Sequence, residues 1–200
     1  MVKTKIYSLT LALDNWKPRI WRRIWVRDDI PLPALSTALY QSMGWCGCHL
    51  SEIRLDGKIY GDCTEDPPDD WLDWTKYTLR DILKPGSKYL HYFYDFGDNW
   101  KLTARIELKP TLDSEAPYPV CVNGKNAPPP EDVGVYGGFD QFIHIMNNPK
   151  HKEYRETAEW CASEDFDPKH FSVDEVNDFI QDPDEYEERY REYIKKSLRI

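Results

Sequence analysis

The first residues able to do chemistry lie in the segment Tyr94-Asp-Phe-Gly-Asp-Asn-Trp100, which places Asp95 and Asp98 on one tight turn. Two neighbouring carboxylates can hold a divalent cation or take up a substrate proton. Alternatively, these side chains hydrogen-bond the backbone of the turn while Gly97 supplies a positive φ. The Asp-Phe-Gly tripeptide also occurs in protein kinases, but the chain has no glycine-rich loop and no His-Arg-Asp catalytic loop.

A second segment, Cys46-Gly-Cys-His49, offers ligands for a tetrahedral zinc ion, with Cys63 and Cys121 as further thiols. The spacing is tighter than the C-x₂-C spacing usual for zinc, and a second such pair is missing. A free cysteine is also commonly a small buried apolar residue. His49 is either a proton carrier or a hydrogen-bonded structural histidine. Cys46, Cys48, His49 and Cys63 are therefore the candidate metal ligands.

The third segment, residues 19–27, alternates arginine and tryptophan on one face of an expected strand. Cations and flat rings are what single-stranded nucleic acid requires for phosphate neutralisation and base stacking. In the alternative, the tryptophans pack under a neighbouring element while the arginine stems cover the rings and their heads pair with acids. The expected contacts with a partner are Trp21, Arg22, Arg23, Trp25, Arg27 and Trp100.

The fourth segment, Pro128-Pro-Pro-Glu-Asp-Val-Gly134, has a stiff extended backbone that leads to Glu131 and Asp132. These acids are candidates for catalysis together with the turn carboxylates and His49. Otherwise they are solvated loop charges or partners of Arg22. Long connections inside compact domains are often functional, which favours a role for this pair.

The elements that must position these segments begin with a hairpin. Tyr7 to Leu13 alternates as a half-buried strand, and residues 19–27 follow as its partner. A helix is expected after Asp29, ending at Gly44, and residues 49–60 predict a second hairpin around Asp56-Gly57. Strands are also expected at 89–94 and 100–108, and a short helix at 78–83.

The remaining segments predict loops and then helices. Residues 62–75 read as an acidic loop and 111–138 as an irregular connection. Helices are expected from Phe139, after the capping box Ser172-x-x-Glu175, and from Asp182-Pro183 onward. The fold class is α+β: one domain, 1–200, with a mainly antiparallel sheet in 1–110, helices packed on it, and a helical part in 139–200.

Composition limits the function classes. Hydrophobic residues form 40% of the 200-residue chain, which suffices for a core, and no apolar run approaches the length of a membrane span. An odd number of cysteines, five, suits free thiols and a cytoplasmic address. The net charge of −9 disfavours non-specific DNA binding, but residues 1–58 carry an excess of Lys and Arg.

These segments, in this order, resemble the Ri-plasmid ORF-three family of uncharacterised plasmid- and transposon-associated proteins, some labelled resolvase-like. The resemblance implies an α+β fold with an antiparallel sheet and no established reaction, substrate or cofactor. Where the family's proline–acid motif runs into a cysteine and paired glycines, this chain has Val133 and Val135, which argues against a thiol mechanism. The resemblance is carried by Pro18-Arg-Ile-Trp-Arg-Arg-Ile24, Met43-Gly-Trp45, His49-Leu50, Tyr94–Trp100 and Pro129-Pro-Glu-Asp132.

The segments lead to one hypothesis about the site and three about function. The turn at 95–99 and the loop at 128–134 are expected to converge near strand 19–27, with acids on one wall of a groove and Arg and Trp on the other. The favoured function is a non-enzymatic binding or adaptor module for single-stranded nucleic acid or a protein partner, with no cofactor. The alternative is a Mg²⁺- or Mn²⁺-dependent hydrolase or phosphotransfer enzyme, in which His49 moves protons. The third reading is a purely structural domain.

Overall fold

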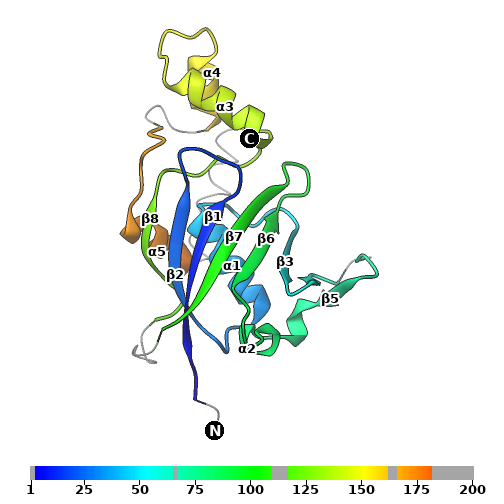
Figure 1. Cartoon of the computed structure of the whole chain (residues 1–200). Coiled ribbons are helices and arrows are strands. Elements are labelled where there is room, and N and C mark those ends of the chain that lie inside the picture. The colour runs from blue at the N-terminus through cyan, green and yellow to red at the C-terminus, as the bar shows by residue number, and fades with distance from the viewer. Residues whose placement is uncertain (1–2, 65–66, 110–116, 162–165, 182–200) are drawn as a thin grey trace.

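A computed structural model describes residues 3–64, 67–109, 117–161 and 166–181. Its main element is one mixed sheet, drawn in Figure 1. The strands are β1 (Ile6–Leu13), β2 (Trp21–Arg27), β3 (Ser51–Leu55), β4 (Lys58–Gly61), β5 (Trp71–Asp73), β6 (Tyr89–Tyr94), β7 (Trp100–Lys109) and β8 (Val120–Lys125). The helices are α1 (Leu32–Ser42), the 3₁₀ turn η1 (Trp74–Lys76), α2 (Leu79–Ile82), α3 (Val135–Met146), α4 (Tyr154–Trp160) and α5 (Val173–Gln181).

The eight strands run in the order β5-β4-β3-β6-β7-β1-β2-β8. Every neighbouring pair is antiparallel except β4 and β5, which are parallel. The fold is therefore α+β with a mainly antiparallel sheet, and the predicted fold class is confirmed. In the register of β1 with β2, Leu9 pairs with Ile24 and Thr10 with Arg23. Apolar and polar pairs thus alternate between the two faces of the sheet.

One face of the sheet carries the core and is covered by α1. Leu32, Leu35 and Leu39 of this helix are fully buried, and α5 packs against α1 and β8 on the same side. Seen as in Figure 1, both helices lie behind the strands. No helix of the described residues lies over the front face, which we call the open face. Charged and aromatic side chains on it remain accessible.

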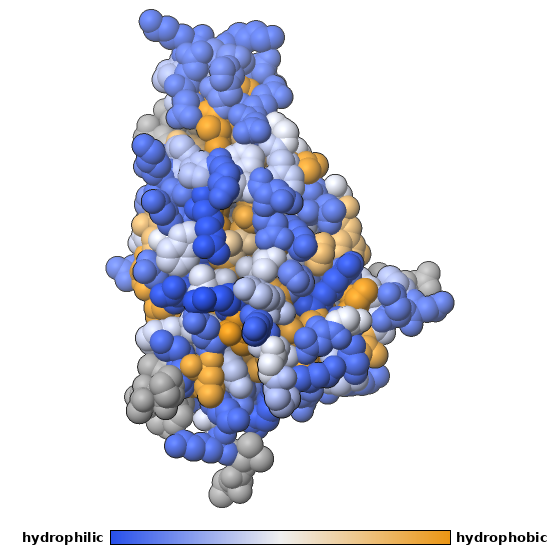
Figure 2. Space-filling view, viewed as in Figure 1, coloured by the Kyte–Doolittle hydropathy of each residue, from blue (hydrophilic) through white to orange (hydrophobic). Residues whose placement is uncertain are grey.

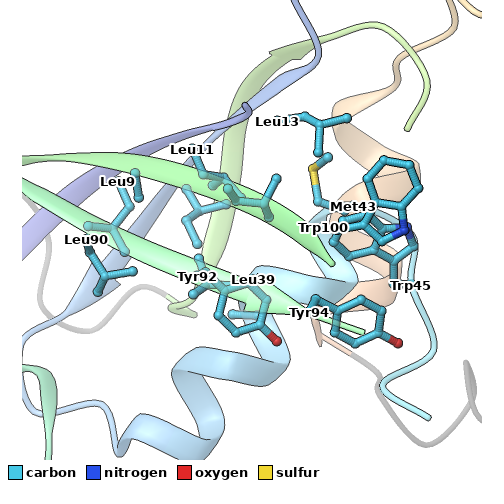
Figure 3. Packing of buried hydrophobic residues seen from close by; sticks show 14 of the residues in the cluster. Leu9, Leu11, Leu13, Leu39, Met43, Trp45, Leu90, Tyr92, Tyr94 and Trp100 are labelled. Atoms are coloured by element: carbon cyan, nitrogen blue, oxygen red, sulfur yellow. The ribbon is translucent and has the colours of Figure 1, made fainter. Parts of the chain in front are cut away.

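The core ends in a stack of aromatic rings where β6 and β7 meet (Figure 3). The Trp45 ring lies 4.8 Å from that of Tyr94 and 6.3 Å from that of Trp100, measured between centroids. All three residues are at most 1% exposed. Because Tyr94 and Trp100 flank the turn at 95–99, this stack fixes the base of that turn.

Three segments differ from the expectation. Residues 62–75 contain β5 and η1, and the stretch 111–138 contains β8, which pairs with β2 at the sheet edge. Helix α3 begins at Val135, so Gly138 lies inside it; a Cβ there would collide with the carbonyl of Val133. Short edge strands of three to six residues give weak alternation, which explains why sequence pattern alone missed them.

The predicted carboxyl-terminal elements are described in part. Ser172 Oγ accepts from the amide of Glu175 at 3.3 Å, which supports the expected capping at the start of α5. The helix expected from Asp182 lies outside the described residues. Within the described ranges, no helix has the length and apolar character that crossing a bilayer requires.

Candidate functional site

Four candidate residues meet beyond the end of β6 and form what we call the His49 cluster: His49, Asp95, Glu131 and Asp132. His49 Nδ1 lies 3.9 Å from Asp95 Oδ1. On the other side of the ring, Nε2 lies 3.2 Å from Asp132 Oδ1 and 3.8 Å from Glu131 Oε2. The imidazole therefore has a carboxylate next to each of its nitrogens.

The turn at 95–99 presents Asp95 to this cluster. Asp95 and Asn99 have positive φ values of 56° and 54°, and Asp95 Oδ1 accepts from the amides of Gly97 at 2.9 Å and Asp98 at 3.3 Å. The structural reading of the turn therefore holds for these bonds, but its expectation of a positive φ at Gly97 is wrong, because Asp95 and Asn99 take that conformation instead. Asp98 is not part of the cluster, because its Oδ2 accepts from the Gly134 amide at 3.0 Å. That bond ties the turn to the proline loop.

The proline loop is held by the aromatic stack and by the segment after α1. Trp45 Nε1 donates to the carbonyl of Pro129 at 3.0 Å. Glu131 Oε1 accepts from the Cys46 amide at 2.7 Å and from the Tyr94 hydroxyl at 2.8 Å. The Glu131 side chain is 11% exposed, so its carboxylate is held in the protein interior by two donors.

Burial sets the electrostatics of this carboxylate. Desolvation raises the pKa of Glu131, and the Cys46 amide and the Tyr94 hydroxyl oppose that rise. Burial and the adjacent Glu131 charge in turn raise the pKa of Tyr94, which keeps its hydroxyl protonated as a donor. Within the His49 cluster, two buried side-chain atoms have no hydrogen-bond partner in the described part of the chain. They are Nε2 of His49 and Oε2 of Glu131.

A cavity of about 370 Å³ adjoins the cluster. It lies between α1 and the segment 47–51, and it gives the 26% exposed His49 side chain access to solvent. Residues lining it include Ser36, Thr37, Tyr40, His49, Asp62 and Trp74. The cavity is large enough for several water molecules or a small ligand.

Two groups of side chains have the spacing of metal ligands among the described residues. One is His49 with Asp95 and Asp132, whose ligand atoms all lie within 4.8 Å of one another. The other is Cys46 with Cys48 and Glu131.

The predicted zinc set is not assembled. Cys46 and Cys48 form a disulfide, so the expectation of five free thiols is wrong for this pair and neither sulfur is available as a thiolate ligand. Cys63 is free, but its thiol contacts the Gly61 carbonyl and it belongs to neither group. Cys121 is free and buried in β8.

A different set of candidates shares the open face. Trp21, Arg23, Trp25 and Arg27 alternate with buried residues along β2 and are all half-buried. Arg23 Nε donates to Thr10 Oγ1 at 3.1 Å, and its guanidinium lies 5.7 Å from the Trp21 ring. Arg27 is paired with Asp29 at 2.9 Å, as the structural alternative predicted for the arginine heads.

A groove of about 750 Å³ crosses the open face next to these residues. It lies beside the β1–β2 connection and is lined by four cations, with Asp14 as the single acid. The four cations are Lys17, Arg19, Arg23 and Arg105. Tyr89, which is 52% exposed, adds an aromatic ring to the lining.

Strand register aligns the groove residues in one row. Tyr89 of β6 pairs with Arg105 of β7, Arg105 pairs with Thr10 of β1, and Thr10 pairs with Arg23 of β2. Tyr89 and Arg105 were not among the contact residues predicted from the sequence. Their positions alternate with core residues of predicted strands, but only the strand order places them beside Arg23.

Two predicted contact residues lie away from the open face. Arg22 is 3% exposed; its Nε donates to Ser42 O at 2.9 Å, and its Nη1 donates to the carbonyls of Trp21, Lys125 and Asn126. Burial lowers the pKa of Arg22 to about 10. Trp100 is fully buried in the aromatic stack. Both are structural residues, and Arg22 pairs with carbonyls rather than with the loop acids.

Comparison with known proteins gives the family. A family model described as plasmid pRiA4b ORF-3-like protein matches residues 5–175. The chain belongs to the pRiA4b ORF-3-like family. The uncharacterized protein y4hQ of Sinorhizobium fredii is 32% identical over 179 residues, covering 88% of this chain and 91% of y4hQ.

A solved structure supports the fold of this pRiA4b ORF-3-like chain. The crystal structure of MM3350, a protein of unknown function from Methanosarcina mazei Go1, is 31% identical and aligns with a TM-score of 0.74. The alignment covers 88% of this chain and 99% of MM3350. The suspected family is thereby confirmed, and neither y4hQ nor MM3350 has an assigned function in its name.

The single groove expected from sequence is two separate sites in this pRiA4b ORF-3-like chain. The turn at 95–99 and the loop at 128–134 do converge, with Asp95 and Glu131 both next to His49. The Arg and Trp wall expected beside them lies instead on the open face, in a groove whose lining shares no residue with the cavity at His49.

Proposed function

We propose that this protein is a binding module for single-stranded nucleic acid, which lies along the groove of the open face. The observation that carries the proposal is the row of Tyr89, Arg105 and Arg23 across neighbouring strands, beside Lys17 and Arg19. An uncovered sheet with basic and aromatic side chains suits a flexible strand, because bases can stack on rings while cations neutralise phosphates.

The charges in the groove explain how a protein of net charge −9 can bind a polyanion. Among the lining residues four cations face one carboxylate, and Arg105 is also paired with Glu107 outside the lining at 2.9 Å. The groove therefore keeps an excess of positive charge, while most of the acidic excess lies in other parts of the sequence. Figure 2 shows the same face, where hydrophilic residues surround small hydrophobic spots. Asp14 is itself engaged by Lys101 at 3.4 Å and by the Thr103 hydroxyl at 2.9 Å.

Fluorescence anisotropy with labelled single-stranded DNA and RNA tests the proposal, using the full chain over a range of salt concentrations. Arg105→Gln removes a phosphate partner, so the slope of log K against log salt should decrease by about 0.7. Tyr89→Ala removes a stacking ring and should weaken binding by about 1–3 kcal/mol. Lys152→Gln, which removes one exposed charge on the loop before α4, is the matched control and should change little.

Two results would contradict the proposal. One is the absence of binding to either nucleic acid at low salt, which would leave a protein partner as the ligand of the open face. The other is equal weakening by Arg105→Gln and Lys152→Gln, which would show that only overall charge matters.

A further inference from the structure

We propose that the His49 cluster is a binding site for a first-row divalent transition metal, with His49, Asp95 and Asp132 as protein ligands. The cluster lies apart from the groove of the open face, so this proposal does not depend on nucleic-acid binding. One atom from each of the three residues lies within 4.8 Å of the others. A metal ion with ligand bonds of about 2.0–2.2 Å brings its ligand atoms to within about 4.4 Å of each other, so only small movements are needed.

The unpaired atoms of the cluster indicate a site for a ligand, because the described residues supply no partner for them. Nε2 of His49 and Oε2 of Glu131 are buried, lie 3.8 Å apart and have no hydrogen-bond partner among the described residues. Burying a polar atom without a partner costs on the order of a hydrogen bond. A cation bound at this point would be coordinated by the imidazole and would neutralise the nearby carboxylates.

A protonated histidine alone satisfies these atoms less well. An imidazolium would place positive charge among three carboxylates, but Nε2 makes no hydrogen bond to Asp132 or Glu131 in spite of their proximity. Nδ1 is also 3.9 Å from Asp95, beyond hydrogen-bond distance. An ion bound to one ring nitrogen could reach both Asp95 and Asp132, because one ligand atom from each of the three residues lies within 4.8 Å of the others.

The donor set narrows the choice of metal. Imidazole nitrogen suits Zn²⁺, Fe²⁺ and similar ions, while carboxylate oxygen suits Mn²⁺ and Mg²⁺. A mixed set of one nitrogen and two carboxylates therefore favours Mn²⁺, Fe²⁺ or Zn²⁺ over Mg²⁺. The adjoining cavity of about 370 Å³ leaves room for water or a further ligand on the open side of the ion.

The test is a titration of the full chain with Mn²⁺ and with Zn²⁺ by calorimetry, with Mg²⁺ as the hard-cation comparison. We expect saturable binding of one ion of Mn²⁺ or Zn²⁺, and weaker binding of Mg²⁺. Pulsed EPR of the Mn²⁺ complex should show coupling to a ¹⁴N nucleus. That signal separates coordination at His49 from diffuse attraction of cations to acidic residues elsewhere in the chain.

Three variants assign the ligands. His49→Gln should remove the nitrogen coupling and lower affinity roughly tenfold or more. Asp132→Asn should lower affinity to a similar extent, and because the Asp132 side chain is 61% exposed, this variant should fold even if the histidine variant does not. Asp98→Asn removes a charge from the same turn while keeping an oxygen for the Gly134 amide, so it should bind within about twofold of the parent.

The proposal is overturned by any of three results. These are the absence of saturable Mn²⁺ and Zn²⁺ binding below millimolar concentration, a Mn²⁺ complex without nitrogen coupling, and an Asp132→Asn variant that binds as tightly as Asp98→Asn.

Discussion

The hydroxyl of Tyr94 donates to Oε1 of Glu131 at 2.8 Å and accepts from the amide of Gly47 at 3.0 Å. One phenol thereby joins three segments: the end of β6, the proline loop and the connection after α1. It is also part of the aromatic stack, so the position of the Glu131 carboxylate depends directly on core packing.

Tyr94→Phe should destabilise the fold by about 1–3 kcal/mol, because a buried carboxylate loses a donor and the Gly47 amide loses its acceptor. Tyr92→Phe is the matched control. The Tyr92 hydroxyl is also buried, but its partner is the neutral hydroxyl of Ser36 at 2.9 Å. Urea unfolding at neutral pH measures both. Equal losses in the two variants would mean that the charge of Glu131 adds nothing to the Tyr94 bond.

Arg22 and Arg23 are adjacent, yet the same substitution should affect different properties. Arg22→Lys should cost more than about 2 kcal/mol of stability, since an ammonium group cannot reach the four carbonyls that the guanidinium bonds. Arg23→Lys should leave the free energy of unfolding within about 0.5 kcal/mol, because the side chain lies on the open face.

Denaturation curves measure the free energy of unfolding of these variants, and oligonucleotide titrations measure their affinity for single-stranded nucleic acid. Arg23→Gln should weaken binding of single-stranded nucleic acid with little loss of stability. If Arg23→Gln unfolds the protein as readily as Arg22→Lys, the two faces of β2 are not separated as described.

Asp14→Asn should tighten nucleic-acid binding several-fold at low salt. The substitution removes the single carboxylate of the groove lining and keeps an oxygen for the Thr103 hydroxyl. It also releases Lys101 from its ion pair. Asp140→Asn, an equal charge change at an exposed position of α3, is the control for overall charge. An affinity gain that is the same in both variants, or that persists at high salt, would argue against a local effect.

The pair Arg27–Asp29 should contribute to stability in a pH-dependent manner. Hydrogen bonds from Arg27 lower the pKa of Asp29 to about 2. Because the folded-state pKa is below the ordinary value of 3.8, the stabilisation is present above pH 3.8 and is lost as pH falls from there towards 2. Asp29→Asn should therefore be less stable than the parent at neutral pH, and the difference should vanish near pH 2.

The effect at neutral pH should be smaller than about 1 kcal/mol, since both side chains are more than a third exposed. Chemical denaturation at several pH values measures this difference in the free energy of unfolding. In a double-mutant cycle, the difference between the parent and Arg27→Gln should also become smaller as the pH falls. Adding Asp29→Asn to the Arg27→Gln variant should cost little further stability. If the difference in stability between the parent and Asp29→Asn stays constant down to pH 2, the loss of stability has a cause other than this ion pair.

Local pattern was sufficient for much of the fold. Alternation in β1 and β2 and the positive-φ turn at Asp56-Gly57 depend on neighbours in sequence, and the corresponding elements form. The convergence of the turn at 95–99 with the loop at 128–134 was also predicted. It was inferred because the segments that carry the family resemblance are also the segments whose residue types could do chemistry.

The parts that pattern missed depend on distant contacts. Arg22 is an inward-facing position of an alternating strand, but its partners on α1 and just after β8 are set by tertiary structure. The row of Tyr89, Arg105 and Arg23 requires the order β6-β7-β1-β2, in which non-consecutive strands are neighbours. Strand order cannot be derived from the sequence of one chain, so the binding surface was predicted with only part of its residues.

The interior position of β1 has a consequence for how the chain folds. This first strand pairs with β2 on one side and with β7 on the other, where Ile6 is opposite Lys109. A growing polypeptide can form the β1–β2 hairpin early, but the sheet cannot be completed until β7 has been synthesised. Pairings of such long sequence separation slow folding, because the entropy of closing a large loop is lost before the contacts form. Until then the edge of β1 that faces β7 is unpaired and can template strands of other chains, and pairing with β7 removes that edge.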